Sequence, residues 1–196
     1  MFNIETFDKM KIKKDGNCLF RAISCFLDKD LNSCRRKTNG EPVLPQLQQK
    51  ETDISSSLRI LVIHYLMLHK KQFSSSLHFD NELYDSIEDR INTIKNEGEF
   101  AGNLELYVIS KMFRIQINVY VNKDKMFNLV SKIGNYNLSC NLFFDYNHYE
   151  LLTLNSDYIE QFNKEKDKWL EDNPDIKFEY INYSFEHESD NEFELI

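Results

Sequence analysis

The spacing of apolar residues changes near residue 114, and this change constrains the fold more than any other feature of the chain. Before it, apolar residues recur every three or four positions, the spacing of one face of an α-helix. After it they alternate with polar residues, as in Ile115, Ile117 and Val119, the period of a β-strand with one buried face. The sequence therefore predicts an α+β domain, with a small, mostly antiparallel sheet packed between helices.

Helical spacing is found in several separate segments of the first half of the chain. The expected helices cover residues 18–28, 54–73, 81–96 and 103–113. Between the first two, residues 30–53 are polar, contain Gly40, Pro42 and Pro45, and show no sustained period. We expect this segment to be a long surface connection, a place where binding specificity often resides.

The strand pattern of the second half predicts a hairpin and two further strands. The hairpin joins the alternating residues 115–120 to residues 126–133 through a turn at residues 122–124. Residues 141–146 and 148–154 are expected to be strands as well. The sheet is thus built largely from the second half of the chain.

The last 42 residues differ from the rest in charge. Residues 155–196 hold 13 acidic residues against four lysines, a net charge of −9, and leave +1 on residues 1–154. We therefore divide the chain into a domain at residues 1–154 and an acidic C-terminal extension. Residues 156–172 of the extension are expected to form a helix that packs on the domain through an apolar stripe, with Pro174 just beyond its end. The stripe consists of Ile159, Phe162, Trp169 and Leu170.

Several classes of function do not fit the composition. The chain shows no basic stripe that would bind nucleic acid, and no apolar run that would span a bilayer or act as a secretory signal. Its four cysteines form no CxxC pair and its five histidines no HExxH motif, so neither a disulfide framework nor a metal site is expected. We expect a cytoplasmic protein with reduced thiols and no membrane attachment.

Cys18 is the main candidate nucleophile. It follows the turn-forming Asp15, Gly16 and Asn17 and starts the first predicted helix. The positive end of a helix dipole favours the thiolate, the reactive form of a cysteine whose ordinary pKa is about 8.5. From spacing alone, the alternative that Cys18 is a packed small apolar side chain is favoured.

The other three cysteines are weaker candidates. Cys25 lies seven residues after Cys18, on the apolar face of the same helix, and is predicted to be core. Cys34 is flanked by Arg35 and Arg36, which would lower its pKa, and is a distant second nucleophile. Cys140, at a strand edge, is assigned to packing.

His148 is the candidate base. On a strand, His148 and Glu150 point to the same face while Tyr149 points to the other, so a carboxylate two residues away can orient the imidazole. The apolar neighbours of this pair predict a rigid central strand. Taken alone, this strand favours the alternative of a half-buried histidine beside a surface glutamate.

Four segments together resemble one known family. The run DGNCLFRA from Asp15 to Ala22 resembles the signature of the OTU (ovarian tumour) cysteine proteases, which remove ubiquitin from proteins. Residues 58–66, residues 99–106 and the close His148-Tyr149-Glu150 resemble further segments of that family, in the same order. The resemblance covers about residues 10–154 and implies a papain-like OTU fold for this part of the chain.

The resemblance implies a role for each matching residue. Cys18 becomes the nucleophile, His148 the general base and then acid, Glu150 the orienting residue, and Asp15 the residue that shapes the oxyanion loop. The backbone N–H groups expected to form the oxyanion hole are those of Asp15, Gly16, Asn17 and Cys18.

Two departures from the family pattern bear on the site. Glu150 stands where the family more often has Asp or Asn, so Asn17 and Asn147 remain alternatives for orienting the imidazole. Phe100-Ala101 replaces Trp-Gly, which changes the lining of the expected substrate groove. That groove is assigned to Phe100, Ala101 and Gly102.

The resemblance implies a deubiquitinase that hydrolyses the isopeptide bond at ubiquitin's C-terminal glycine, on substrates or in polyubiquitin chains. No metal or other cofactor is needed, and a monomer is expected. Residues 30–53 and the helix at 81–96 are assigned to contact with ubiquitin, and the acidic extension is an alternative second ubiquitin-binding surface. The other candidate functions are a protease for another ubiquitin-like modifier and a non-catalytic ubiquitin-binding module. If the protein is a secreted effector, the expected location becomes the host cytosol.

Overall fold

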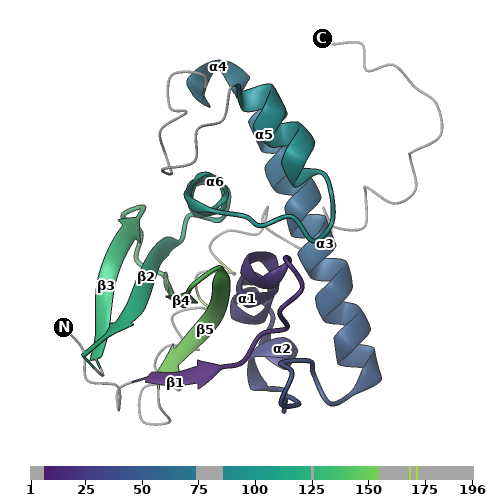
Figure 1. The fold of residues 1–196 in the computed structure, drawn as a ribbon, viewed down its shortest axis with the longest axis vertical. Helices are drawn as coiled ribbons and strands as arrows, with labels where there is room; N and C mark the ends of the chain where they lie inside the picture. The colour runs from purple at the N-terminus through teal and green to yellow at the C-terminus, as the bar shows by residue number, and fades with distance from the viewer. Residues whose placement is uncertain (1–6, 74–85, 125, 155–167, 169–170, 172–196) are drawn as a thin grey trace.

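The computed structural model describes residues 7–73, 86–124, 126–154, 168 and 171 (Figure 1). Within these ranges one five-stranded sheet packs against helices, which confirms the predicted α+β class. None of the helices in the described part of the chain is both long and apolar enough to cross a bilayer.

The sheet has the strand order β1-β5-β4-β2-β3. Its strands are β1 (Phe7–Met10), β2 (Gln116–Lys123), β3 (Met126–Ile133), β4 (Ser139–Asp145) and β5 (His148–Leu154). β2 and β4 pair in parallel, and the other three pairings are antiparallel. The predicted hairpin and the two later strands are therefore confirmed. β1 is an addition, since four residues are too few to show a strand period.

Six helices complete the described fold: α1 (Cys18–Leu27), α2 (Lys29–Ser33), α3 (Pro45–Leu68), α4 (Lys70–Phe73), α5 (Ile87–Ile94) and α6 (Asn103–Phe113). α1 lies between β5 and the long helix α3 (Figure 1). Every residue of α1 is buried, including Arg21 and Ser24, so this helix is the centre of the core. Cys18 is its first residue, so a rigid helix carries the thiol.

The expected long connection over residues 30–53 is wrong at both ends, because its first residues belong to α2 and its last residues to α3. α3 starts at Pro45, nine residues before the predicted start at residue 54. Proline at the first helical position fits, because its fixed φ suits a helix and its missing N–H has no partner there anyway. The first two turns of α3 lack an apolar stripe, and their buried residue is the charged Glu51, so the spacing of apolar residues does not reveal them.

The helix predicted at 54–73 is not continuous, because α3 ends at Leu68 and residues 70–73 form the separate helix α4. The other predicted helices agree with the structure to within two residues where it describes them. α6 has the predicted bounds, and α5 occupies residues 87–94 of the predicted 81–96. Residues 81–85 of that segment lie outside the described residues, as does the expected helix at 156–172 except for Lys168 and Glu171.

Candidate active site

Cys18 starts α1 directly after a tight loop, residues 15–17, which we call the DGN loop. Gly16 has a φ of +77°, and a Cβ there would lie 1.7 Å from the carbonyl oxygen of Gly98. Only glycine therefore fits, and the DGN loop packs directly against the turn that follows α5. Cys18 itself is 2% exposed.

The fold brings Cys18 to the start of β5, about 130 positions later in the chain. The Cys18 thiol faces the carbonyl oxygen of Asn147 (Sγ–O 3.9 Å), and the N–H of Tyr149 donates to Sγ at 3.5 Å. These two groups belong to the residues on either side of His148. Burial raises the pKa of Cys18, while the N–H groups of Tyr149 and Leu19 lower it in part.

His148 and Glu150 share a face of β5, as their spacing predicts. The imidazole Nε2 lies 4.0 Å from Glu150 Oε1 and is buried, with no hydrogen-bond partner within the described residues. The other carboxylate oxygen of Glu150 forms an ion pair with Lys9 of β1 (Oε2–Nζ 2.8 Å). Burial lowers the pKa of His148, and the charge of Glu150 opposes that shift. The lowered pKa favours a neutral imidazole, carried by the strand whose backbone contacts the buried thiol.

Asp15 organises the DGN loop from within. Its Oδ1 accepts the N–H of Asn17 at 3.1 Å, and its carboxylate pairs with Arg21 of α1 at 2.8 Å. The Asn17 N–H thus already has a partner, and the N–H groups of Cys18 and Leu19 join that of Tyr149 at the sulfur. The side-chain oxygen of Asn17 accepts hydrogen bonds from Arg59, so Asn17 does not orient His148 here.

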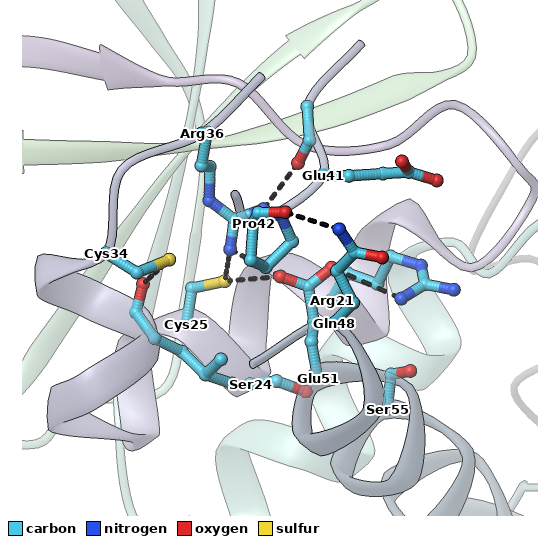
Figure 2. Close-up of polar contacts among 12 residues, drawn as sticks. Arg21, Ser24, Cys25, Cys34, Arg36, Glu41, Pro42, Gln48, Glu51 and Ser55 are labelled. Atoms are coloured by element: carbon cyan, nitrogen blue, oxygen red, sulfur yellow. Dashed lines mark hydrogen bonds and ion pairs between the residues drawn. The ribbon is translucent and has the colours of Figure 1, made fainter. Parts of the chain in front are cut away.

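A buried network of ion pairs extends from Arg21 to Glu51 and on to Arg36 (Figure 2). Arg21 Nη1 lies 3.2 Å from Glu51 Oε1, and the other oxygen of Glu51 pairs with Arg36. Arg36 also donates to the sulfur of Cys25 and to the carbonyl oxygen of Gly40. The network therefore ties the DGN loop to α3 and to the segment between α2 and α3.

The other cysteines take the places expected of them, with one correction. Cys25 and Cys140 are fully buried. Cys34 is half-buried, and its pKa is raised, because burial outweighs the effect of the Arg36 charge. The prediction that basic neighbours lower the pKa of Cys34 is therefore wrong.

The residues assigned to the substrate groove line a cavity beside this site. Phe100, Ala101 and Gly102 lie along a cavity of about 390 Å³, whose wall also contains Asn147 and Tyr149, the two neighbours of His148. The apolar Val130 of β3 forms part of the rim and is 58% exposed. The cavity thus reaches the two chain neighbours of His148, while Cys18 and His148 themselves do not line it.

Two cations at this site were given no role by the sequence interpretation. Lys9 contacts Glu150 through the pairing of β1 with β5, which no local pattern reveals. Arg59 sits among Leu58, Ile60 and Leu61, and a charged residue inside an apolar run indicates a buried partner. That signal was present in the sequence.

A buried thiol held against the strand that carries a neutral imidazole, with helix-start N–H groups on its sulfur, is suited to nucleophilic acyl transfer. Among the residues that the structure describes, no group of His, Cys, Asp or Glu side chains is placed to hold a metal ion.

Comparison with known proteins agrees with this geometry. A protein of Tipula iridescent virus named "Putative ubiquitin thioesterase" is 26% identical over 151 residues, 72% of this chain but 15% of that protein, so the chain spans a small part of its length. The OTU domain protease of Taggert virus superposes with a TM-score of 0.58 at 17% identity, covering 78% of this chain and 82% of that one. The Hazara virus OTU, solved bound to ubiquitin, gives 0.54 at 15% identity, covering 78% and 85%.

A family model also matches most of the chain. The model of the OTU-like cysteine proteases matches residues 13–152, which include the DGN loop, Cys18, the cavity wall and β5 up to Leu152. This chain belongs to the OTU-like cysteine protease family.

Proposed function

We propose that this protein is a deubiquitinase that hydrolyses the isopeptide bond at the C-terminal glycine of ubiquitin. The observation that carries the proposal is the position of the Cys18 sulfur between the backbone groups of Asn147 and Tyr149, on either side of His148. Membership of the OTU-like cysteine protease family supports the same reaction.

The first half of the reaction forms a thioester. His148 takes the proton of Cys18, and the sulfur attacks the carbonyl carbon of the glycine. The carbonyl oxygen becomes an oxyanion, which the N–H groups at the start of α1 stabilise. The carbon–nitrogen bond then breaks, and the imidazolium of His148 protonates the departing lysine amine.

The second half regenerates the enzyme. Neutral His148 removes a proton from water, the hydroxide attacks the thioester carbonyl, and the carbon–sulfur bond breaks with release of the ubiquitin carboxylate. Cys18 recovers its proton from His148. Glu150 orients the imidazole and stabilises its protonated form in both halves.

Ubiquitin is the partner we propose, on substrates and in polyubiquitin chains. The Hazara virus relative is solved with ubiquitin, and the cavity lined by Asn147 and Tyr149, the neighbours of His148, has room for a narrow peptide tail. Arg90 of α5 lines this cavity, in keeping with the assignment of residues 81–96 to substrate contact. Residues 30–53 do not line it, so their contact with the body of ubiquitin stays a prediction. Unchanged KM after replacement of the exposed residues in both segments would contradict that assignment.

A ubiquitin probe with a C-terminal electrophile tests the proposal. We expect the wild-type chain to form a covalent adduct, and Cys18→Ala to form none. Cys34→Ala is the matched control, since Cys34 is the more exposed thiol and lies outside the site. Loss of labelling in the Cys34 variant would place the nucleophile elsewhere.

Two other outcomes select the rival functions. Labelling only by the probe of another ubiquitin-like modifier would make that modifier the substrate. Ubiquitin binding without any labelling would make the chain a non-catalytic binding module. The cytoplasmic or host-cytosol location and the monomeric state stay predictions, which fractionation and sedimentation would test.

A further inference from the structure

Arg59 of α3 is a buried cation in direct contact with the DGN loop. Its side chain reaches Asn17 Oδ1 from Nε at 3.2 Å and from Nη2 at 2.5 Å, and Nη2 also lies 3.5 Å from the carbonyl oxygen of Gly16. The residue is 2% exposed. The two loop residues that precede Cys18 are therefore both held by one guanidinium.

The same guanidinium also holds the turn that lies behind the loop. Nη1 donates to the carbonyl oxygen of Ile94, at the end of α5, and Nη2 to that of Glu99, each at 2.9 Å. The DGN loop and the turn after α5, which are distant in sequence, thus both meet α3 at Arg59. The guanidinium carbon of Arg59 also lies 4.6 Å from the centre of the Phe20 ring. All four acceptors are neutral. These hydrogen bonds therefore fix the positions of the loop and the turn, but they do not neutralise the charge of Arg59.

This arrangement leaves the DGN loop little freedom. Gly16 packs so closely on Gly98 that no side chain fits at that position. With Oδ1 of Asn17 held by two donors of Arg59, the orientation of the Asn17 amide is set. The planar fork of arginine can bind these acceptors together, whereas the single ammonium of lysine cannot.

We propose that Arg59 is a positioning residue for the reaction: it holds the Gly16 and Asn17 end of the DGN loop so that the N–H groups at the start of α1 face Cys18 and the oxyanion. The proposal rests on the proposed function for its kinetic readout. Arg59 touches neither the sulfur nor the imidazole in any contact of the structure, so it acts through the loop.

Arg59→Lys is the informative variant, because it keeps the charge and most of the apolar stem but loses the fork. A displacement of about 1 Å in a catalytic group costs about 100-fold in rate. With a fluorogenic amide of ubiquitin as substrate, we expect Arg59→Lys to lower kcat by about 10-fold to 100-fold. KM should stay within about threefold of the wild-type value, since Arg59 does not line the cavity.

Val62→Ala is the matched control. Val62 is fully buried in the same helix, one turn further along, and belongs to the hydrophobic core. It should lower the melting temperature and leave kcat unchanged. Equal losses of kcat in the two variants at equal loss of stability would overturn the proposal, as would a wild-type kcat in Arg59→Lys.

Coupling to Asn17 separates positioning from general support of the fold. If Arg59 acts through the Asn17 side chain, the double variant Arg59→Lys, Asn17→Ala should lose little more kcat than either single variant. Independent effects, with the two losses multiplying, would contradict the proposal.

A second readout does not depend on ubiquitin. Alkylation of Cys18 by iodoacetamide, followed by mass spectrometry, reports how well the N–H groups of the helix start support the thiolate. We expect Arg59→Lys to slow this alkylation at pH 8 by about threefold, and Val62→Ala to leave it unchanged. If the wild-type chain does not cleave the ubiquitin amide, the proposed function fails, and the alkylation result alone decides the role of Arg59.

Discussion

At the scale of single residues, burial decides the protonation of the proposed catalytic pair. It raises the pKa of Cys18 and lowers that of His148, so both groups favour their neutral forms. The thiol must therefore give its proton to the imidazole as it attacks, and the imidazole must be neutral to accept it. Because the pKa of His148 is lowered, the neutral form persists below the ordinary value of about 6.5.

This protonation state predicts the pH dependence of the enzyme. We expect the acidic limb of kcat/KM on a ubiquitin amide to have its midpoint below pH 6.5, because the lowered pKa of His148 delays its protonation. The alkylation of Cys18 should have its midpoint above about 8.5, the value of an ordinary cysteine. An acidic limb centred above pH 7 would contradict the assignment of His148 as a neutral base.

The ion pair between Lys9 and Glu150 leads to a second prediction at the scale of single residues. It pairs with Glu150 and lies over the ring of Phe143, 4.5 Å from its centre, so Lys9→Met keeps the stem and removes only the charge. The charge of Lys9 lowers the pKa of His148, and its loss should move the acidic limb of kcat/KM to higher pH. Lys9→Arg, which keeps the ion pair, should leave the limb in place. A limb that does not move in Lys9→Met would show that Lys9 does not act on the site.

At the scale of elements, an irregularity in β3 shapes the cavity. Val119 pairs with Ser131 while the next residue, Tyr120, pairs with Leu129, so Val130 is an extra residue in the edge strand. Such bulges bend a strand and turn a side chain away from its regular direction. Val130 consequently lines the cavity, although simple alternation would not assign it there.

The bulge predicts a specific effect on substrate binding. Val130→Lys places a charge on the apolar rim, and we expect KM for the ubiquitin amide to rise about tenfold, or about 1.4 kcal/mol, with kcat unchanged. Lys132→Glu, which changes an exposed residue of the same strand outside the cavity, is the control. A KM that stays unchanged in Val130→Lys would exclude the cavity rim from the binding surface.

The start of α3 is held by a buried carboxylate as well as by the packing of Leu47 on the core. Glu51 is 1% exposed and lies between Arg21 and Arg36, so Glu51→Gln leaves two buried cations without their shared carboxylate (Figure 2). We expect a loss of about 3 kcal/mol in the free energy of unfolding, measured with urea. Asp53→Asn, in an exposed position of the same helix, should change it by less than about 0.5 kcal/mol. Equal stability of the two variants would contradict a structural role of the network.

At the scale of the whole molecule, charge is concentrated outside the catalytic domain. Residues 155–196 carry a net charge of −9, and the family match ends at residue 152. The division into a domain at residues 1–154 and an acidic extension is our proposal. The apolar stripe in the extension favours packing on the domain.

Truncation after Leu154 tests this division. Loss of the apolar stripe should expose the surface that it covers, and we expect the melting temperature to fall by about 4 °C or more. Cleavage of the ubiquitin amide, assayed where both proteins are folded, should be retained. An unchanged melting temperature with weaker cleavage of ubiquitin chains would instead make the extension a second ubiquitin-binding surface.

The sequence by itself determined the elements with regular apolar spacing. Its local patterns made Cys18 and His148 candidates, and the resemblance to the OTU family turned these candidates into catalytic assignments. The strands β2 to β5 and the helix α6 follow from periodicity alone, because side-chain direction repeats with a fixed period in each kind of element. Tertiary structure alone decided the rest. The first turns of α3 depend on Glu51 meeting two arginines from other segments, and Lys9 reaches Glu150 only because β1 pairs with β5. Contacts between distant segments leave no local period, so neither Arg59 nor Val130 could be placed at the site before the chain was folded.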